Sequence, residues 1–152
     1  MIVLDGDAYL TPIPVNDDFY SLSAILLNDD YYYYILEHSK VEDGLHHANI
    51  EALICLKAKA FLDIKLRIEN GSNEDVKQLK KHKADVFRLT IMLTPESIFE
   101  LPETIQTHVN QFAQFSAHDL PDKAIFKEMG LSNIVPNAVF EQFKKSFRVS
   151  II

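Results

Sequence analysis

The sequence is poor in several residue types that define specialised classes of protein. Its one cysteine, Cys55, excludes an internal disulfide and any zinc cluster built on cysteines. It has only four glycines, and their spacing forms neither a phosphate loop nor a dinucleotide-binding turn. No apolar run reaches the length that a membrane-spanning helix needs. The first residues carry no basic flank, so we expect no signal peptide and a cytoplasmic location.

Basic side chains are scarce in the first third of the chain. Up to Leu56 the only lysine or arginine is Lys40, whereas most of the basic residues fall between Lys57 and Arg88. The whole chain has a formal net charge of −7. An acidic front part therefore precedes a basic centre, and two interpretations stay open. Either the two parts neutralise each other on solvated faces, or the basic helices meet an anion such as a nucleotide or nucleic acid.

The rest of the composition is typical of one folded domain. Hydrophobic residues make up 47% and charged residues 24% of the sequence, and 152 residues are enough to bury a core. We predict a single domain over residues 1–152, with a strand-rich front part (1–48) and a helical part (49–152). The fold class is α+β: mostly helical, with a small N-terminal antiparallel sheet or hairpins packed on a C-terminal helical bundle.

Capping and turn residues divide the chain into short elements. Strands are expected at Ile2–Leu4, Ala8–Val15 and Phe19–Leu27, the last of which is also compatible with a helix. The Asn28-Asp29-Asp30 cluster predicts the start of a helix at Tyr31–His38, and Asp43-Gly44 predicts a hairpin within Lys40–His47. Further helices are expected at Ile50–Arg67, Asn73–Leu93, Leu101–His118, Asp119–Met129 and Pro136–Phe147, with breaks at Gly71-Ser72 and Gly130.

A lysine stands on an apolar stripe of the first long helix. The neighbours of Lys57 at three- and four-residue spacing are all apolar: Leu53, Ile54, Ala60 and Phe61. Its stem must therefore lie along a hydrophobic surface while the ammonium group reaches out. One interpretation is a structural lysine at the edge of the core. The other is a cation at the lip of a cleft, suited to a phosphate.

The second long helix brings charged side chains close to its own apolar stripe. His82 lies on that stripe, and Asp85 follows it by three residues and precedes Arg88 by three. Asp85 is a hydrogen-bond partner for His82, or else for a lysine of the first helix. His82, Asp85 and Arg88 would in one case form a structural polar network that fixes the helix pairing. In the other case a carboxylate and a lysine meet at the edge of an active site.

Four consecutive tyrosines occupy positions 31–34. On a helix they cover every face, so one side must be exposed or meet a partner. The surrounding aspartates repel phosphate, which disfavours nucleic acid. Tyrosine is enriched at protein interfaces, and we therefore predict an interface at Tyr31 and Tyr34. Self-association or a protein partner is expected, and no membrane.

The two long helices together carry a resemblance to a known family. The segment Leu53–Leu66 followed by Lys80–Leu93 resembles the C-terminal signature of AbiEii-type nucleotidyltransferase-like proteins. These belong to the DNA polymerase β-like nucleotidyltransferase superfamily and include toxins of bacterial toxin–antitoxin systems. The family's Leu-x-x-x-Lys-x-x-Ala pattern is matched by Leu53, Lys57 and Ala60, and its second helix is matched approximately by Lys81, Asp85 and Val86. His82 stands where the family usually carries an acid.

The resemblance implies roles for a few residues and also shows what is missing. Lys57 and Asp85 would be supporting catalytic residues, and Lys57 and Lys81 would contact a phosphate or nucleotide. The family's phosphate-binding Gly-Ser or Gly-Gly turn with a downstream Asp-x-Asp or Asp-x-Glu pair has no counterpart, because Asp5-Gly6-Asp7 has too few residues before it. We expect no metal site and no cofactor in this chain alone, and Mg²⁺ with a nucleoside triphosphate only if the missing half is supplied.

Two hypotheses from different classes follow. In the first, the chain is a nucleotidyltransferase-like fragment that lacks the metal-binding carboxylates and is inactive alone, with a nucleotide as its ligand. In the second, it is a non-catalytic protein-interaction module, of a toxin–antitoxin type system by the same resemblance. The absent carboxylates favour the second hypothesis for this chain taken alone.

Overall fold

The computed structural model describes Ile25, residues 28–73 and residues 76–150. In chain order the described elements are α2 (Asp29–Glu37), β1 (Ser39–Glu42), β2 (Leu45–Ala48), α3 (Ile50–Glu69), α4 (Val76–Thr90), α5 (Glu103–Ala117), α6 (Ala124–Lys127) and α7 (Pro136–Ser146). The fold is therefore α+β and mostly helical, as predicted. None of the helices in these ranges is both long and apolar enough to cross a membrane.

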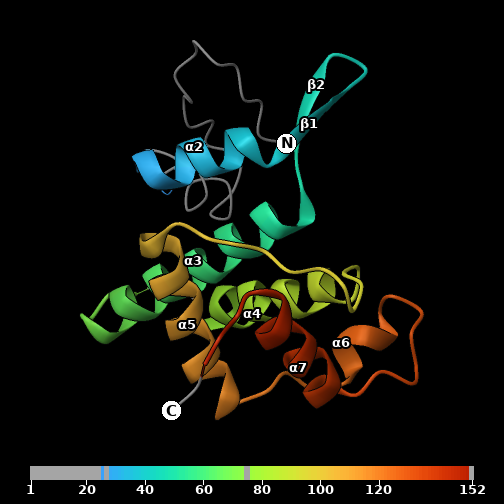
Figure 1. Cartoon of the computed structure of the whole chain (residues 1–152). Coiled ribbons are helices and arrows are strands. Elements are labelled where there is room, and N and C mark those ends of the chain that lie inside the picture. The colour runs from blue at the N-terminus through green and yellow to red at the C-terminus, as the bar shows by residue number, and fades with distance from the viewer. Residues whose placement is uncertain (1–24, 26–27, 74–75, 151–152) are drawn as a thin grey trace.

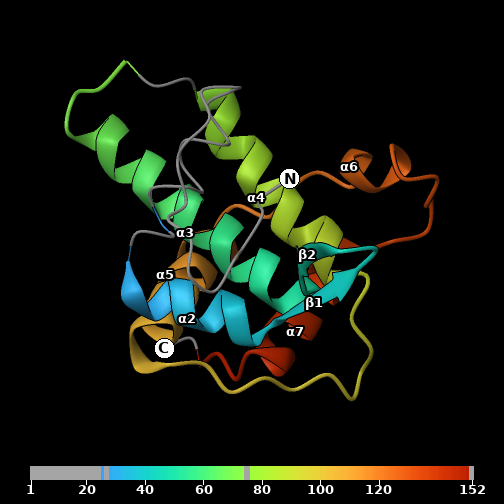
Figure 2. The ribbon, with the colours of Figure 1, turned by 90° about the horizontal axis from the view of Figure 1, so that it is seen from above.

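Helix α3 forms the centre of the molecule. It packs against α2, α4 and α5, and Figures 1 and 2 both show α4 lying beside it. Because three helices surround it, α3 buries side chains on several faces, among them Ile54, Leu56 and Phe61. Helix α7 packs against α4 as well.

Aromatic side chains join the helices of the core. The Phe61 ring of α3 meets Phe112 of α5 edge to face at 5.2 Å between ring centroids. Phe112 in turn meets Phe143 of α7 at 5.6 Å, and Phe87 of α4 stacks on Phe140 of α7 at 6.1 Å. Such pairs stabilise packing beyond the area that they bury, so α3, α4, α5 and α7 share one core.

The first helix and the hairpin form where the local residues predict them. The Asn28 side chain accepts a hydrogen bond from the Asp30 backbone N–H at 3.0 Å, which caps α2. Asp43 and Gly44 have positive φ angles of 51° and 78°, as a tight turn between antiparallel strands requires. The register runs from Ser39↔Ala48 to Glu42↔Leu45. In Figure 1 this hairpin projects away from the helices.

Helices α6 and α4 are clearly shorter than the sequence predicts. The segment Asp119–Met129 is helical only over α6, because the Asp122 side chain accepts from the Ala124 backbone N–H at 2.8 Å and starts the helix there. Gly130, with φ of 80°, then ends it as predicted. Helix α4 ends at Thr90 rather than Leu93, since Leu93 N–H bonds to the Thr90 carbonyl in a tighter turn.

The predicted strands at Ile2–Leu4, Ala8–Val15 and Phe19–Leu27 lie outside the described residues, apart from Ile25. That residue is buried and helical.

Candidate functional site

Lys57 and Asp85 form an ion pair between the two long helices. The Lys57 Nζ of α3 lies 3.1 Å from the Asp85 Oδ2 of α4. Their side chains are only 16% and 21% exposed, so water screens the attraction less than on an open surface. Asp85 therefore pairs with a lysine of the first long helix, which is one of the two partners predicted for it.

Arg88 extends this pair into a chain of alternating charges. Its guanidinium donates to Asp85 Oδ1 at 3.2 Å and to Glu128 Oε2, beyond α6, at 2.7 Å. Its Nε also donates to the Ile125 carbonyl at 3.4 Å. The charge network formed by Lys57, Asp85, Arg88 and Glu128 contains equal numbers of cations and anions. It ties α6 and α3 to α4.

The other residues predicted near this network have different surroundings. His82 is fully buried on the packed side of α4. Lys81 is exposed, whereas Lys57 is largely buried, so the two lysines expected to share a phosphate do not share an environment. Within the predicted polar network, Arg88 Nη1 lies 3.2 Å from Asp85 Oδ1.

The prediction that Tyr31 and Tyr34 form an interface is wrong. Tyr31 is fully buried, and its hydroxyl hydrogen-bonds His108 Nδ1 at 2.8 Å. Tyr34 is 3% exposed and stacks on His38 with ring centroids 4.1 Å apart. Three-residue spacing puts both tyrosines on the same face of α2, and that face packs on α3 and α5. Tyr33 is the exposed member of the run.

The Tyr31–His108 contact lies in a low-dielectric setting. Burial is the main cause that raises the pKa of Tyr31, so its hydroxyl stays protonated at neutral pH. Burial, followed by the Lys59 ammonium, lowers the pKa of His108, and Asp63 opposes this. The pair is therefore uncharged at neutral pH and connects α2 to α5.

His108 lines a groove between α3 and α5 with a volume of about 440 Å³. Helix α3 contributes Lys59, Leu62, Asp63, Lys65, Leu66 and Glu69, and α5 contributes His108, Gln111, Gln114 and Phe115. The α3 charges pair along their own helix: Lys59 with Asp63 at 2.7 Å and Lys65 with Glu69 at 3.2 Å. Lys65 also lies 4.6 Å from the centre of the Phe115 ring. We call this feature the α3–α5 groove.

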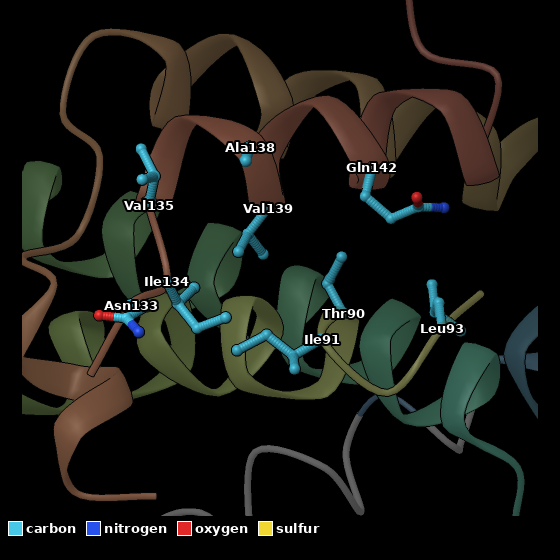
Figure 3. A pocket seen from close by; sticks show the side chains of 9 residues that line it. All are labelled: Thr90, Ile91, Leu93, Asn133, Ile134, Val135, Ala138, Val139 and Gln142. Atoms are coloured by element: carbon cyan, nitrogen blue, oxygen red, sulfur yellow. The ribbon is translucent and has the colours of Figure 1, made fainter. Parts of the chain in front are cut away.

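A second hollow, the α4–α7 pocket, lies between the end of α4 and the first half of α7 (Figure 3). Its volume is about 300 Å³. Apolar side chains dominate the lining: Ile91, Leu93, Ile134, Val135, Ala138 and Val139. Asn133 and Gln142 place amide groups at its two ends in Figure 3, and Gln142 Nε2 donates to the Thr94 carbonyl at 3.0 Å. The pocket was not predicted, because its lining comes from segments far apart in the sequence.

Lys83 is a further polar residue that sequence reasoning missed. It is 8% exposed, and its ammonium donates to the Asp119 carbonyl at 2.8 Å and to Asp119 Oδ2 at 2.9 Å. The hydrogen bond from Lys83 lowers the pKa of the Asp119 carboxyl. Helical spacing could have revealed Lys83, since it is four residues from Leu79 and four from Phe87, two apolar residues that share its face of the helix.

Within the described ranges, no group of three or more His, Cys, Asp or Glu side chains is placed to hold a metal ion. Comparisons of the chain with family models, with curated proteins and with solved structures found no match.

Proposed function

We propose that the chain is a non-catalytic protein-interaction module, and that the α4–α7 pocket receives an apolar side chain of a protein partner. The observation that carries the proposal is the pocket itself. Its volume of about 300 Å³ is roughly twice that of a dry cavity able to hold one benzene molecule. Apolar anchors that enter such pockets supply much of the binding energy of protein interfaces.

Exposed apolar surface around the pocket favours a protein over a free small molecule. Val135, at the rim, is 58% exposed, and Met92, between two lining residues, is 59% exposed. A partner that covers these side chains removes apolar area from water both inside and outside the pocket. The amides of Asn133 and Gln142 provide the polar rim that interfaces usually have.

The charge network supports a structural role for the residues that the resemblance assigned to a site. Lys57 is held by Asp85, and Asp85 is held by Arg88 as well. A phosphate bound at Lys57 would compete with an existing carboxylate and repel it. The network therefore stabilises the helix pairing on which the pocket is built.

A peptide library displayed on phage, selected against the purified chain, tests the proposal. We expect enriched peptides to share one large apolar residue. Ala138→Leu fills the pocket from its rim, and Asn137→Leu places the same side chain at an exposed position that does not line it. Binding that weakens about tenfold or more in Ala138→Leu alone supports the proposal. Peptides that bind both variants like the wild type refute it.

The nucleotidyltransferase-like fragment remains a second candidate, favoured by the Lys57–Asp85 pair at the positions that the resemblance assigns. In that case a missing half would supply Mg²⁺ and the metal-binding carboxylates, in a bacterial toxin–antitoxin setting. Calorimetry with ATP, CTP, GTP and UTP plus Mg²⁺ tests it. Nucleotide binding by the wild type that is lost in Lys57→Ala supports this candidate. If none of the four nucleotides gives a heat of binding, the candidate is excluded for this chain. For either function we propose a cytoplasmic location.

A further inference from the structure

One stripe of α3 is complementary to itself when the helix direction is reversed. Lys59, Leu62, Leu66 and Glu69 follow one another at spacings of three, four and three residues, so they lie along one face of the helix. All four line the α3–α5 groove. We call them the groove stripe. The stripe reads basic, apolar, apolar, acidic from one end to the other.

We infer that the α3–α5 groove is a dimerisation surface, on which a second copy of this chain lays its own α3 antiparallel to the first. In that orientation Lys59 of each copy faces Glu69 of the other. Leu62 of each copy faces Leu66 of the other. A parallel orientation would instead put lysine against lysine and glutamate against glutamate. Charge complementarity therefore selects both the occupant and its direction.

The apolar centre of the groove stripe is open to solvent in the single chain. Leu66 is 57% exposed, and Phe115, on the α5 side of the groove, is 45% exposed. In the dimer these side chains would be covered at the centre, with the charged ends of the stripe at the rim. The contact is isologous, so each favourable pair occurs twice.

The ion pairs already present in the groove are compatible with this contact. Lys59 is paired with Asp63, and Lys65 with Glu69, each within its own helix. The second copy would give Lys59 and Glu69 a further opposite charge without breaking those pairs. The groove stripe shares no residue with the α4–α7 pocket, so this inference stands or falls independently of the proposed function.

Sedimentation velocity over a range of concentrations tests the dimer. The wild type should change from 17.4 kDa to twice that mass as concentration rises. Leu66→Ser should raise the dissociation constant about tenfold or more, because it removes both apolar contacts at the centre. Val76→Ser is the matched control, since Val76 is 51% exposed on α4 and outside the groove. A wild type that stays monomeric to about 1 mM, or a dimer that Leu66→Ser leaves unchanged, overturns the inference.

A charge swap tests the antiparallel direction. Lys59→Glu places glutamate against Glu69 at both ends and should weaken the dimer about tenfold. The double variant Lys59→Glu/Glu69→Lys restores opposite charges across the contact and should recover most of the affinity. Circular dichroism melts check that each variant is folded. A dimer of unchanged affinity in folded Lys59→Glu, or no recovery in a folded double variant, contradicts the antiparallel arrangement.

Discussion

The Lys57 ammonium on α3 lies 3.1 Å from the Asp85 carboxylate on α4, across the helix pair with the most extensive contact among the described elements. Lys57 projects from an otherwise apolar stripe of α3, and its ammonium pairs with Asp85 on the neighbouring helix. Arg88 binds the other carboxylate oxygen. The Lys57–Asp85 ion pair therefore helps to fix which faces of α3 and α4 meet.

A double-mutant cycle with Lys57→Met and Asp85→Asn measures the pair. Methionine keeps the apolar stem of Lys57, so the loss reports mainly the charge contact. We expect each single variant to lower the free energy of unfolding by about 1–2 kcal/mol, with a coupling energy of about 1 kcal/mol, between the values for exposed and buried pairs.

Urea unfolding provides the measurement, and the Lys40–Glu42 pair provides the control. Those side chains are 62% and 58% exposed, so their cycle should give a coupling energy near zero. Equal coupling in both cycles would contradict a structural role specific to Lys57 and Asp85.

The tyrosines of α2 should differ sharply when each is truncated. Tyr31→Ser should lower the free energy of unfolding by about 3–5 kcal/mol, because it leaves a cavity in the core and removes the partner of His108. Tyr33→Ser should change it by less than about 0.5 kcal/mol, since that side chain is largely exposed. Thermal melts of the two variants are sufficient. Similar losses in both would show that α2 buries a different face.

Stability should fall as the pH drops through the ordinary pKa of histidine. The folded pKa of His108 is lowered below 6.5, chiefly by burial and then by Lys59, with Asp63 opposing. Below 6.5 the unfolded chain therefore binds the proton more readily than the folded one. The stability that the neutral His108 contributes is fully present above pH 6.5. It is lost as the pH falls from 6.5 toward the lower pKa of His108 in the folded chain.

His108→Gln removes this titration while its amide can still hydrogen-bond the Tyr31 hydroxyl. The free energy of unfolding of this variant, measured by urea denaturation at a series of pH values, should decline less between about pH 7.5 and 5.5 than that of the wild type. Parallel curves for the two proteins would exclude His108 as the group responsible.

Lys83 should matter more than its acidic partner. Its ammonium bonds both the carbonyl and the carboxylate of Asp119, whereas Asp119→Ala removes only the carboxylate contact. We expect Lys83→Met to cost about 1–3 kcal/mol of unfolding free energy and Asp119→Ala less than about 1 kcal/mol. Chemical denaturation of both variants measures the two losses of unfolding free energy. A larger loss in Asp119→Ala than in Lys83→Met would show that the carboxylate dominates the contact.

Much of the helical organisation could be predicted because its signals are local. The Asn28 cap, the Asp43-Gly44 turn and the Pro136 start act within a few residues, and α2, the hairpin and α7 form where they indicate. The length of the helix before Gly130 was overestimated. Asp122 caps the backbone at Ala124, and that competing start was not recognised.

The positions of the side chains were harder to predict for physical reasons. Four tyrosines in a row give no contrast in polarity, so the sequence cannot show which of them faces the core. Lys83 was hidden in a lysine-rich segment, although burial and the Asp119 contacts distinguish it. Lys57 and Asp85 could be predicted to pair, because both stand near apolar stripes of neighbouring helices. The α4–α7 pocket depends on tertiary packing between α4 and α7, to which no local pattern refers.

The central claim is that the chain acts by binding a protein partner through the α4–α7 pocket. Methyl NMR during titration with a peptide selected on the wild type tests it most directly. We predict that the largest shifts fall on Ile91, Leu93, Ile134, Val135 and Val139, and that they vanish in Ala138→Leu but persist in Asn137→Leu. Shifts concentrated elsewhere, or equal shifts in both variants, would contradict the claim.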